Sequence, residues 1–195
     1  MNFLAHFHLA WPEPGLVAGG LDGEYRKGLL RGELHSDLEA GIRLHRRIDA
    51  FTDNHPLVRQ LRSQFPAHLR RYAGILIDLS FDYYLTHHWW RYSDLPLATF
   101  NEAVCRLLQQ RQNELSPGAK RMLARLLEHD ILNLYHRWDT VTGAAARIGT
   151  RLRRGNALAD VSEDMAPLRA SLDTAFVDFY PDLVEFSDNQ RGRLN

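Results

Sequence analysis

The sequence predicts an all-α protein, one compact domain built as a bundle of six to eight helices. Three observations support this fold class. The alternation of apolar and polar residues that marks β-strands is absent, apolar residues recur at spacings of three and four, and proline or glycine separates the helical segments. A chain of 195 residues has the length of a single domain with a substantial core. We expect this domain to span residues 1–187, followed by a polar tail at 188–195.

The N-terminal part is expected to contain two helices separated by a glycine-rich segment. Residues 1–10 form the first helix, and the run Trp11-Pro12-Glu13-Pro14-Gly15 ends it because proline cannot continue a helix. Residues 16–25 are apolar and rich in glycine. The second helix begins near Ser36, a suitable N-cap with Glu39 three residues later, and runs to Asn54.

The rest of the chain carries helical periodicity divided by proline, glycine and polar loops. Pro56 suits the first position of a helix, and Ser116-Pro117-Gly118 introduces another. The most apolar segment, residues 73–92, is expected at the centre of the bundle. The expected helical ranges are 57–72, 73–92, 97–114, 119–135, 138–153 and 161–186, the last with a restart near Pro167.

The composition excludes several classes of function. Lysine plus arginine and aspartate plus glutamate each number 24, so no overall positive charge indicates a nucleic-acid partner. The single cysteine, Cys105, excludes an internal disulfide and is typical of a reducing compartment. Residues 1–6 lack the basic leader of a signal peptide, and no apolar stretch is long enough to span a membrane. We therefore expect a cytoplasmic protein without a membrane partner; no feature indicates its oligomeric state.

Ionisable side chains recur every four positions on two of the expected helices. His45, Asp49 and Asp53 share one helical face, and Asp78 and Asp82 repeat this spacing inside the most apolar helix. Solvation and ion pairs with neighbouring arginines would explain the first face alone. Two carboxylates in so apolar a helix need a partner, and a shared cation is the simplest one.

A mixed set of imidazole and carboxylate ligands suits Mn²⁺, Fe²⁺ or Zn²⁺ better than Ca²⁺. Such an ion lowers the pKa of bound water and polarises phosphoryl oxygens, so the pattern indicates hydrolysis. Arg46 and Arg47 are candidates for gripping a phosphate, although salt bridges on the helix surface explain them equally well. His6 and His8 point in different directions on a helix, so at most one faces the site. The dipeptide His129-Asp130 has no companion carboxylate helix, and we assign it to the surface.

Three stretches together carry a family resemblance. They are Met1-Asn2-Phe3-Leu4-Ala5-His6-Phe7-His8-Leu9-Ala10, His45-Arg46-Arg47-Ile48-Asp49 with Thr52-Asp53, and Asp78 and Asp82 followed by Leu85 and His88-Trp89. In this combination the chain resembles the acyl carrier protein phosphodiesterase family, most densely over residues 1–90. The resemblance implies hydrolysis of holo-acyl carrier protein to the apo protein and 4′-phosphopantetheine. It also implies an all-helical fold distantly like the HD phosphohydrolases and a divalent metal, typically Mn²⁺, with Mg²⁺, Fe²⁺ or Zn²⁺ as alternatives.

The resemblance also implies, position by position, which residues form the site. The candidate metal ligands are His6, Glu24, His45, Asp49, Asp78, Asp82 and His88. The residues themselves, apart from the resemblance, make Asp49 and Asp82 the candidates for steering the attacking water and Arg46 and Arg47 the candidates for offsetting phosphoryl charge. Spacing leaves open which carboxylate is ligand and which is base. Two positions depart from the family's pattern: Glu24 stands where an aspartate is usual, and Tyr83 stands where a histidine usually follows the aspartate.

The implied partner, acyl carrier protein, is acidic, so its docking surface should be basic. One candidate patch consists of Arg59, Arg62, Arg70 and Arg71, and another of Arg147, Arg151, Arg153 and Arg154. Two other functions would use the same site residues. One is a metal-dependent phosphohydrolase acting on a nucleotide or another small phosphoester, and the other is a helical protein that binds the carrier without chemistry.

Overall fold

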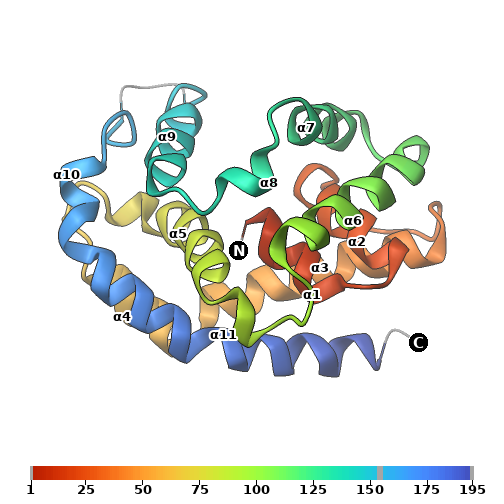
Figure 1. Ribbon diagram of the computed structural model, residues 1–195, viewed down its shortest axis with the longest axis horizontal. Helices are drawn as coiled ribbons and strands as arrows, with labels where there is room; N and C mark the ends of the chain where they lie inside the picture. The colour runs from red at the N-terminus through yellow and green to blue at the C-terminus, as the bar shows by residue number, and fades with distance from the viewer. Residues whose placement is uncertain (1, 153–155, 194–195) are drawn as a thin grey trace.

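The computed structural model describes residues 2–152 and 156–193, and it confirms the all-α class. In these residues the regular elements are helices, and no β-strand occurs. The α-helices are α1 (Phe3–Ala10), α2 (Pro14–Tyr25), α3 (Ser36–Asn54), α4 (Pro56–Ser63), α5 (Ala73–His87), α6 (Leu97–Gln110), α7 (Pro117–Glu128), α8 (Ile131–Leu134), α9 (Trp138–Gly149), α10 (Ser162–Met165) and α11 (Arg169–Arg191). Figure 1 shows α7, α8 and α9 along one edge of the molecule and α11 along the opposite edge, with α1, α2, α3 and α5 between them.

Several helix boundaries follow the sequence signals. α3 spans the expected residues 36–54, although its N-cap is His35 and the expected cap, Ser36, is its first helical residue. Pro56 occupies the first turn of α4. The Ser116 hydroxyl accepts a hydrogen bond from the backbone N–H of Ala119 at 3.4 Å and so caps α7. The restart expected near Pro167 is confirmed, because α10 and a short 3₁₀ turn precede α11.

Other segments break or extend differently, which gives more helices than the expected six to eight. α4 ends at Ser63 instead of continuing to residue 72, since Pro66 disfavours helical geometry in the residue before it. α9 ends at Gly149, and the expected end of that helix at residue 153 lies outside the described residues. Residues 188–191, expected in a polar tail, continue α11. Residues 194–195 of that tail also lie outside the described part.

The glycine-rich segment, expected only as an apolar stretch, forms α2. Its glycines at positions 15, 19 and 23 lie on one face of the helix and contact α3 so closely that a Cβ would collide. An ideal Cβ would lie 2.2 Å from Asp37 Cγ at Gly15, 2.5 Å from the Gly41 backbone at Gly19, and 2.6 Å from His45 Cγ at Gly23. Each later glycine of α2 contacts a later residue of α3, so the two helices run parallel. Close packing makes this segment helical although glycine has a poor intrinsic helix propensity.

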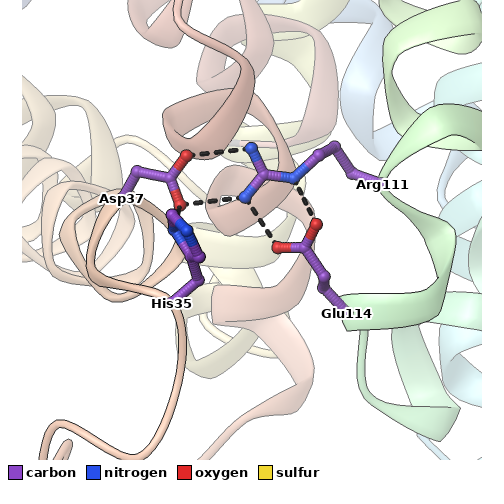
Figure 2. Close-up of polar contacts among 4 residues, drawn as sticks. All are labelled: His35, Asp37, Arg111 and Glu114. Atoms are coloured by element: carbon purple, nitrogen blue, oxygen red, sulfur yellow. Dashed lines mark hydrogen bonds and ion pairs between the residues drawn. The ribbon is translucent and has the colours of Figure 1, made fainter.

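A polar network fixes the N-terminal end of α3 (Figure 2). The Arg111 guanidinium, just after α6, donates to both carboxylate oxygens of Asp37 at 2.8 and 2.9 Å, and it also donates to Glu114 at 2.6 Å. His35 Nδ1 lies 2.6 Å from Asp37 Oδ1. The hydrogen bonds from Arg111 hold the pKa of Asp37 well below its usual range. This network ties α3 to the end of α6 at a point remote in sequence.

The N-terminal helix α1 lies in the hydrophobic core. Leu4, Ala5 and Phe7 are fully buried, and His6 on the same helix is only 2% exposed. The His6 side chain therefore lies in the interior of the molecule. In the described residues, no helix combines the length and apolar character needed to cross a bilayer.

Candidate metal centre and active site

Two helices bring a pair of histidines onto one carboxylate. His6 from α1 and His45 and Asp49 from α3 each offer a ligand atom, and these atoms lie within 4.8 Å of one another. His6 Nε2 is 3.1 Å from Asp49 Oδ1, and His45 Nε2 is 3.2 Å from Asp49 Oδ2. The imidazole rings stack with centroids 4.0 Å apart. We refer to these three residues as the histidine–aspartate cluster.

The helices hold the two histidine rings by different means. The backbone N–H groups of Leu4 and Ala5 donate to Asp82 at 2.8 and 3.2 Å, so a fully buried carboxylate of α5 caps α1. This cap positions the helix that carries His6. The His45 ring rests against Gly23 of α2, where any larger residue would collide with it.

Burial and hydrogen bonding set the protonation of the cluster. Burial and the adjacent His45 lower the pKa of His6 to about 3, so its ring is neutral at pH 7. Burial favours the protonated form of Asp49, but hydrogen bonds from His45 and His6 outweigh it and hold its pKa well below the usual range. Burial raises the pKa of Asp78, and the charge of Asp49 raises it further. A neutral imidazole and an ionised carboxylate are the forms that bind a cation.

A pocket of about 290 Å³ opens beside this cluster. Its lining includes His6, Glu24, His45 and Asp78, which come from α1, α2, α3 and α5. The outer helices contribute three arginines: Arg125 from α7, Arg147 from α9 and Arg151 from the turn after α9. Apolar side chains that include Phe3, Leu79, Met122 and Ile148, together with the polar side chains of Asn2, Tyr25, Tyr135 and Thr140, complete the lining. The pocket therefore combines imidazole, carboxylate and guanidinium groups around an apolar interior.

The donor set fits a divalent metal. Two imidazole nitrogens and a carboxylate are the ligands that Mn²⁺, Fe²⁺ and Zn²⁺ accept. His45 Nδ1 is buried and has no hydrogen-bond partner in the described part of the chain. An ion bound between His45 Nε2 and Asp49 would take the place of the Nε2 proton that now points at the carboxylate, and the neutral ring would then carry its proton on Nδ1. The carboxylates of Asp78 and Glu24 also line the pocket.

Asp82 and His88, both expected as metal ligands, are not brought to the cluster. Asp82, also expected to be catalytic, accepts the α1 N–H groups one helical turn beyond Asp78, and burial raises its pKa to about 7. His88 follows α5, and its Nε2 donates to Asp173 of α11 at 2.6 Å. Asp53, on the same helix as His45, forms an ion pair with Arg62 instead.

The arginines expected to grip a phosphate point away from the pocket. Arg46 donates to the backbone carbonyl of Arg26 at 2.7 Å, and Arg47 donates to Gln190 at 2.8 Å. Neither lines the pocket, because residues one and two positions after His45 project from other sides of the helix.

The two basic patches differ in their contacts. Members of the first are engaged locally: Arg59 donates to Asn54, Arg62 to Asp53, Arg70 to the Phe65 carbonyl, and Arg71 lies over the Tyr72 ring. In the second, Arg147 and Arg151 line the pocket, and Arg153 and Arg154 lie outside the described residues. Arg125, which joins them, was missed because its distance in sequence from the other two gives no periodic signal.

Other sequence features fall where their chemistry is satisfied. His8 Nε2 donates to the Tyr92 carbonyl at 3.0 Å and Nδ1 lies 2.9 Å from the Tyr180 hydroxyl, so only His6 of the pair reaches the cluster. His129 and Asp130 are exposed, as expected. Of the two departures from the family's pattern, Glu24 lines the pocket, whereas the Tyr83 ring packs against Trp138 and its hydroxyl accepts from Arg169 at 3.1 Å.

Known proteins that are similar to this chain share one family name. The family model described as acyl carrier protein phosphodiesterase matches residues 1–183. A protein of Escherichia coli O157:H7 named acyl carrier protein phosphodiesterase is 35% identical over 188 residues, covering 94% of this chain and 96% of its own length. Proteins of the same name from Pectobacterium atrosepticum and Klebsiella pneumoniae are each 31% identical, covering 98% of this chain and all of their own. No solved structure matches the chain. The chain belongs to the acyl carrier protein phosphodiesterase family.

Proposed function

We propose that this protein is a metal-dependent phosphodiesterase that hydrolyses holo-acyl carrier protein to apo-acyl carrier protein and 4′-phosphopantetheine. The observation that carries the proposal is the convergence of His6, His45 and Asp49 within 4.8 Å beside a pocket. Membership of the family supports holo-acyl carrier protein as the substrate, and the donor set supports metal-assisted hydrolysis as the chemistry. In this proposal Mn²⁺ is the metal, with Mg²⁺, Fe²⁺ and Zn²⁺ as the alternatives that metal analysis distinguishes.

The residues divide into holding and reacting groups. His6, His45 and Asp49 would hold the ion, with Asp78 or Glu24 completing its coordination. A bound divalent ion supplies a Lewis acid for the phosphoryl oxygens and lowers the pKa of a water molecule. The carboxylates of Asp78 and Glu24 on the pocket surface are the candidates for accepting the proton of the attacking water. The apolar lining limits the access of other water molecules to the phosphorus.

The test is the conversion of holo-acyl carrier protein to the apo form, followed by mass spectrometry of the carrier. The wild-type protein with Mn²⁺ should remove the phosphopantetheine mass, and a chelator should stop the reaction. His45→Ala should abolish conversion and metal binding, whereas His129→Ala, which removes an exposed histidine outside the pocket, should leave both unchanged. Turnover of nucleotides with an untouched carrier would favour the small-phosphoester function. Carrier binding without turnover under any divalent metal would favour the binding function.

A further inference from the structure

We propose that Arg125, Arg147 and Arg151, here called the arginine rim, bind the phosphoryl oxygens of the substrate. This inference rests on the proposed function and specifies how the same pocket selects its ligand. The rim residues come from the outer helices, on segments distant in sequence from the histidine–aspartate cluster.

The rim arginines combine two features: they line the pocket, and their side chains have no bonded partner in the described part of the chain. Many other arginines are engaged by the protein itself; Arg43 pairs with Glu39, Arg111 with Asp37 and Arg137 with Asp139. None of the three rim residues forms an ion pair or a side-chain hydrogen bond within the described residues 2–152 and 156–193. Three guanidinium groups that line one pocket without a carboxylate partner repel one another, and an anion relieves that repulsion.

The distribution of charge across the pocket gives the ligand an orientation. The carboxylates of Glu24 and Asp78 come from α2 and α5, whereas the rim comes from α7, α9 and the turn after α9. Without a cation these carboxylates repel a phosphate, whereas the rim attracts it. The non-bridging oxygens of a phosphodiester are therefore drawn towards the rim, where guanidinium groups can form paired hydrogen bonds with them.

The lining between the charged groups constrains the rest of the ligand. Phe3, Leu79, Met122 and Ile148 present apolar surface to the pocket. An ionised group of the ligand that lies against these four side chains would lose hydration without gaining a charged partner. The ligand class that the pocket fits is thus a phosphoester whose attached arm is uncharged.

The rim is tested by the binding of 4′-phosphopantetheine to chelator-treated protein, measured by titration calorimetry. Metal-free protein removes any contribution of a cation, so the measurement reports on the side chains alone. Arg147 is exposed, and its replacement by alanine should leave the fold intact. Arg147→Ala should weaken binding at least about tenfold, because a charge-assisted hydrogen bond is lost. The affinity of Arg147→Lys should lie between those of the wild type and of Arg147→Ala, since lysine keeps the charge but not the planar donor pair.

A matched control and a second variant make the result decisive. Arg106→Ala removes an exposed arginine of α6 outside the pocket, and it should bind as the wild type does. Arg125→Gln should weaken binding from the α7 side of the pocket. Wild-type affinity in both rim variants, or no binding of 4′-phosphopantetheine to the wild-type protein, would overturn the inference. Failure of the proposed function would appear separately, as an unchanged carrier mass in the holo-to-apo assay.

Discussion

Replacing Gly23 with alanine tests whether close packing between α2 and α3 positions a metal ligand. The added Cβ would lie 2.6 Å from His45 Cγ, 2.7 Å from Cδ2 and 2.8 Å from Cβ. These atoms form the base of the ring, so a small torsional change cannot remove the collision. Either α2 moves away from α3 or the His45 side chain leaves the cluster.

Gly20 on the same helix provides the matched control. A Cβ there would lie 3.7 Å from its nearest neighbours, the Cβ and carbonyl oxygen of His6, which is ordinary van der Waals contact. Alanine in a helix interior is favoured over glycine by about 1 kcal/mol. Gly20→Ala should therefore raise the free energy of unfolding by roughly 0.5–1 kcal/mol. Gly23→Ala has the same gain but also an overpacking cost of about 1–3 kcal/mol, so it should be less stable than Gly20→Ala by that amount.

Two measurements on the pair separate stability from ligand placement. Urea denaturation gives the free energies of unfolding, and titration with Mn²⁺ under native conditions gives the metal affinity. Gly23→Ala should lose at least about tenfold in metal affinity because His45 is displaced, while Gly20→Ala keeps the wild-type value. If Gly23→Ala is as stable as Gly20→Ala and binds metal normally, the close contact does not position His45 and the reasoning fails.

Three further predictions concern residues that the sequence analysis singled out. Asp82→Ala should lower the free energy of unfolding, measured by urea denaturation, by roughly 2–6 kcal/mol, because it leaves two buried N–H groups without acceptors. Loss of metal binding at unchanged stability would instead make Asp82 a ligand. Folded Asp82 keeps its proton up to a pKa of about 7, whereas the unfolded chain releases it near 3.8, so stability should fall as pH rises through this window. In Asp82→Asn this fall should be smaller by up to about 4 kcal/mol, as pH-dependent denaturation would show. Tyr83→His should leave metal affinity within about twofold of the wild-type value, whereas Glu24→Asp should change which metal binds most tightly, because only Glu24 lines the pocket. Equal effects of the two substitutions in metal titrations would contradict this placement.

The sequence was most informative where one helix carries the chemistry by itself. The spacing of His45 and Asp49 predicted a shared face, and the structure places both side chains in one cluster. The same reasoning grouped Asp78 with Asp82, which lie on neighbouring turns of α5. Asp78 reaches the pocket and Asp82 caps α1, because periodicity fixes the side of a helix but not which element lies beyond it.

Features that depend on several helices were the least predictable. The helical state of α2 follows from its contact with α3, and its glycines would otherwise favour an irregular segment. The placement of Arg125 beside Arg147 depends on how α7 and α9 meet, which no local pattern encodes. The distant likeness to HD phosphohydrolases stays a prediction, and the one His-Asp dipeptide, His129-Asp130, is exposed and does not contribute to the site.

The site depends on helix placement more than on any single ligand. His6 reaches the cluster only because Asp82 caps α1, and His45 only because Gly23 leaves room for its ring. The Arg111 network holds the start of the helix that carries both His45 and Asp49. Each anchor lies outside the helix that carries the ligand it positions, so a substitution at an anchor changes the relative placement of the ligands while leaving their chemistry intact. The anchors are therefore as much a part of the proposed metal centre as the residues that would touch the ion.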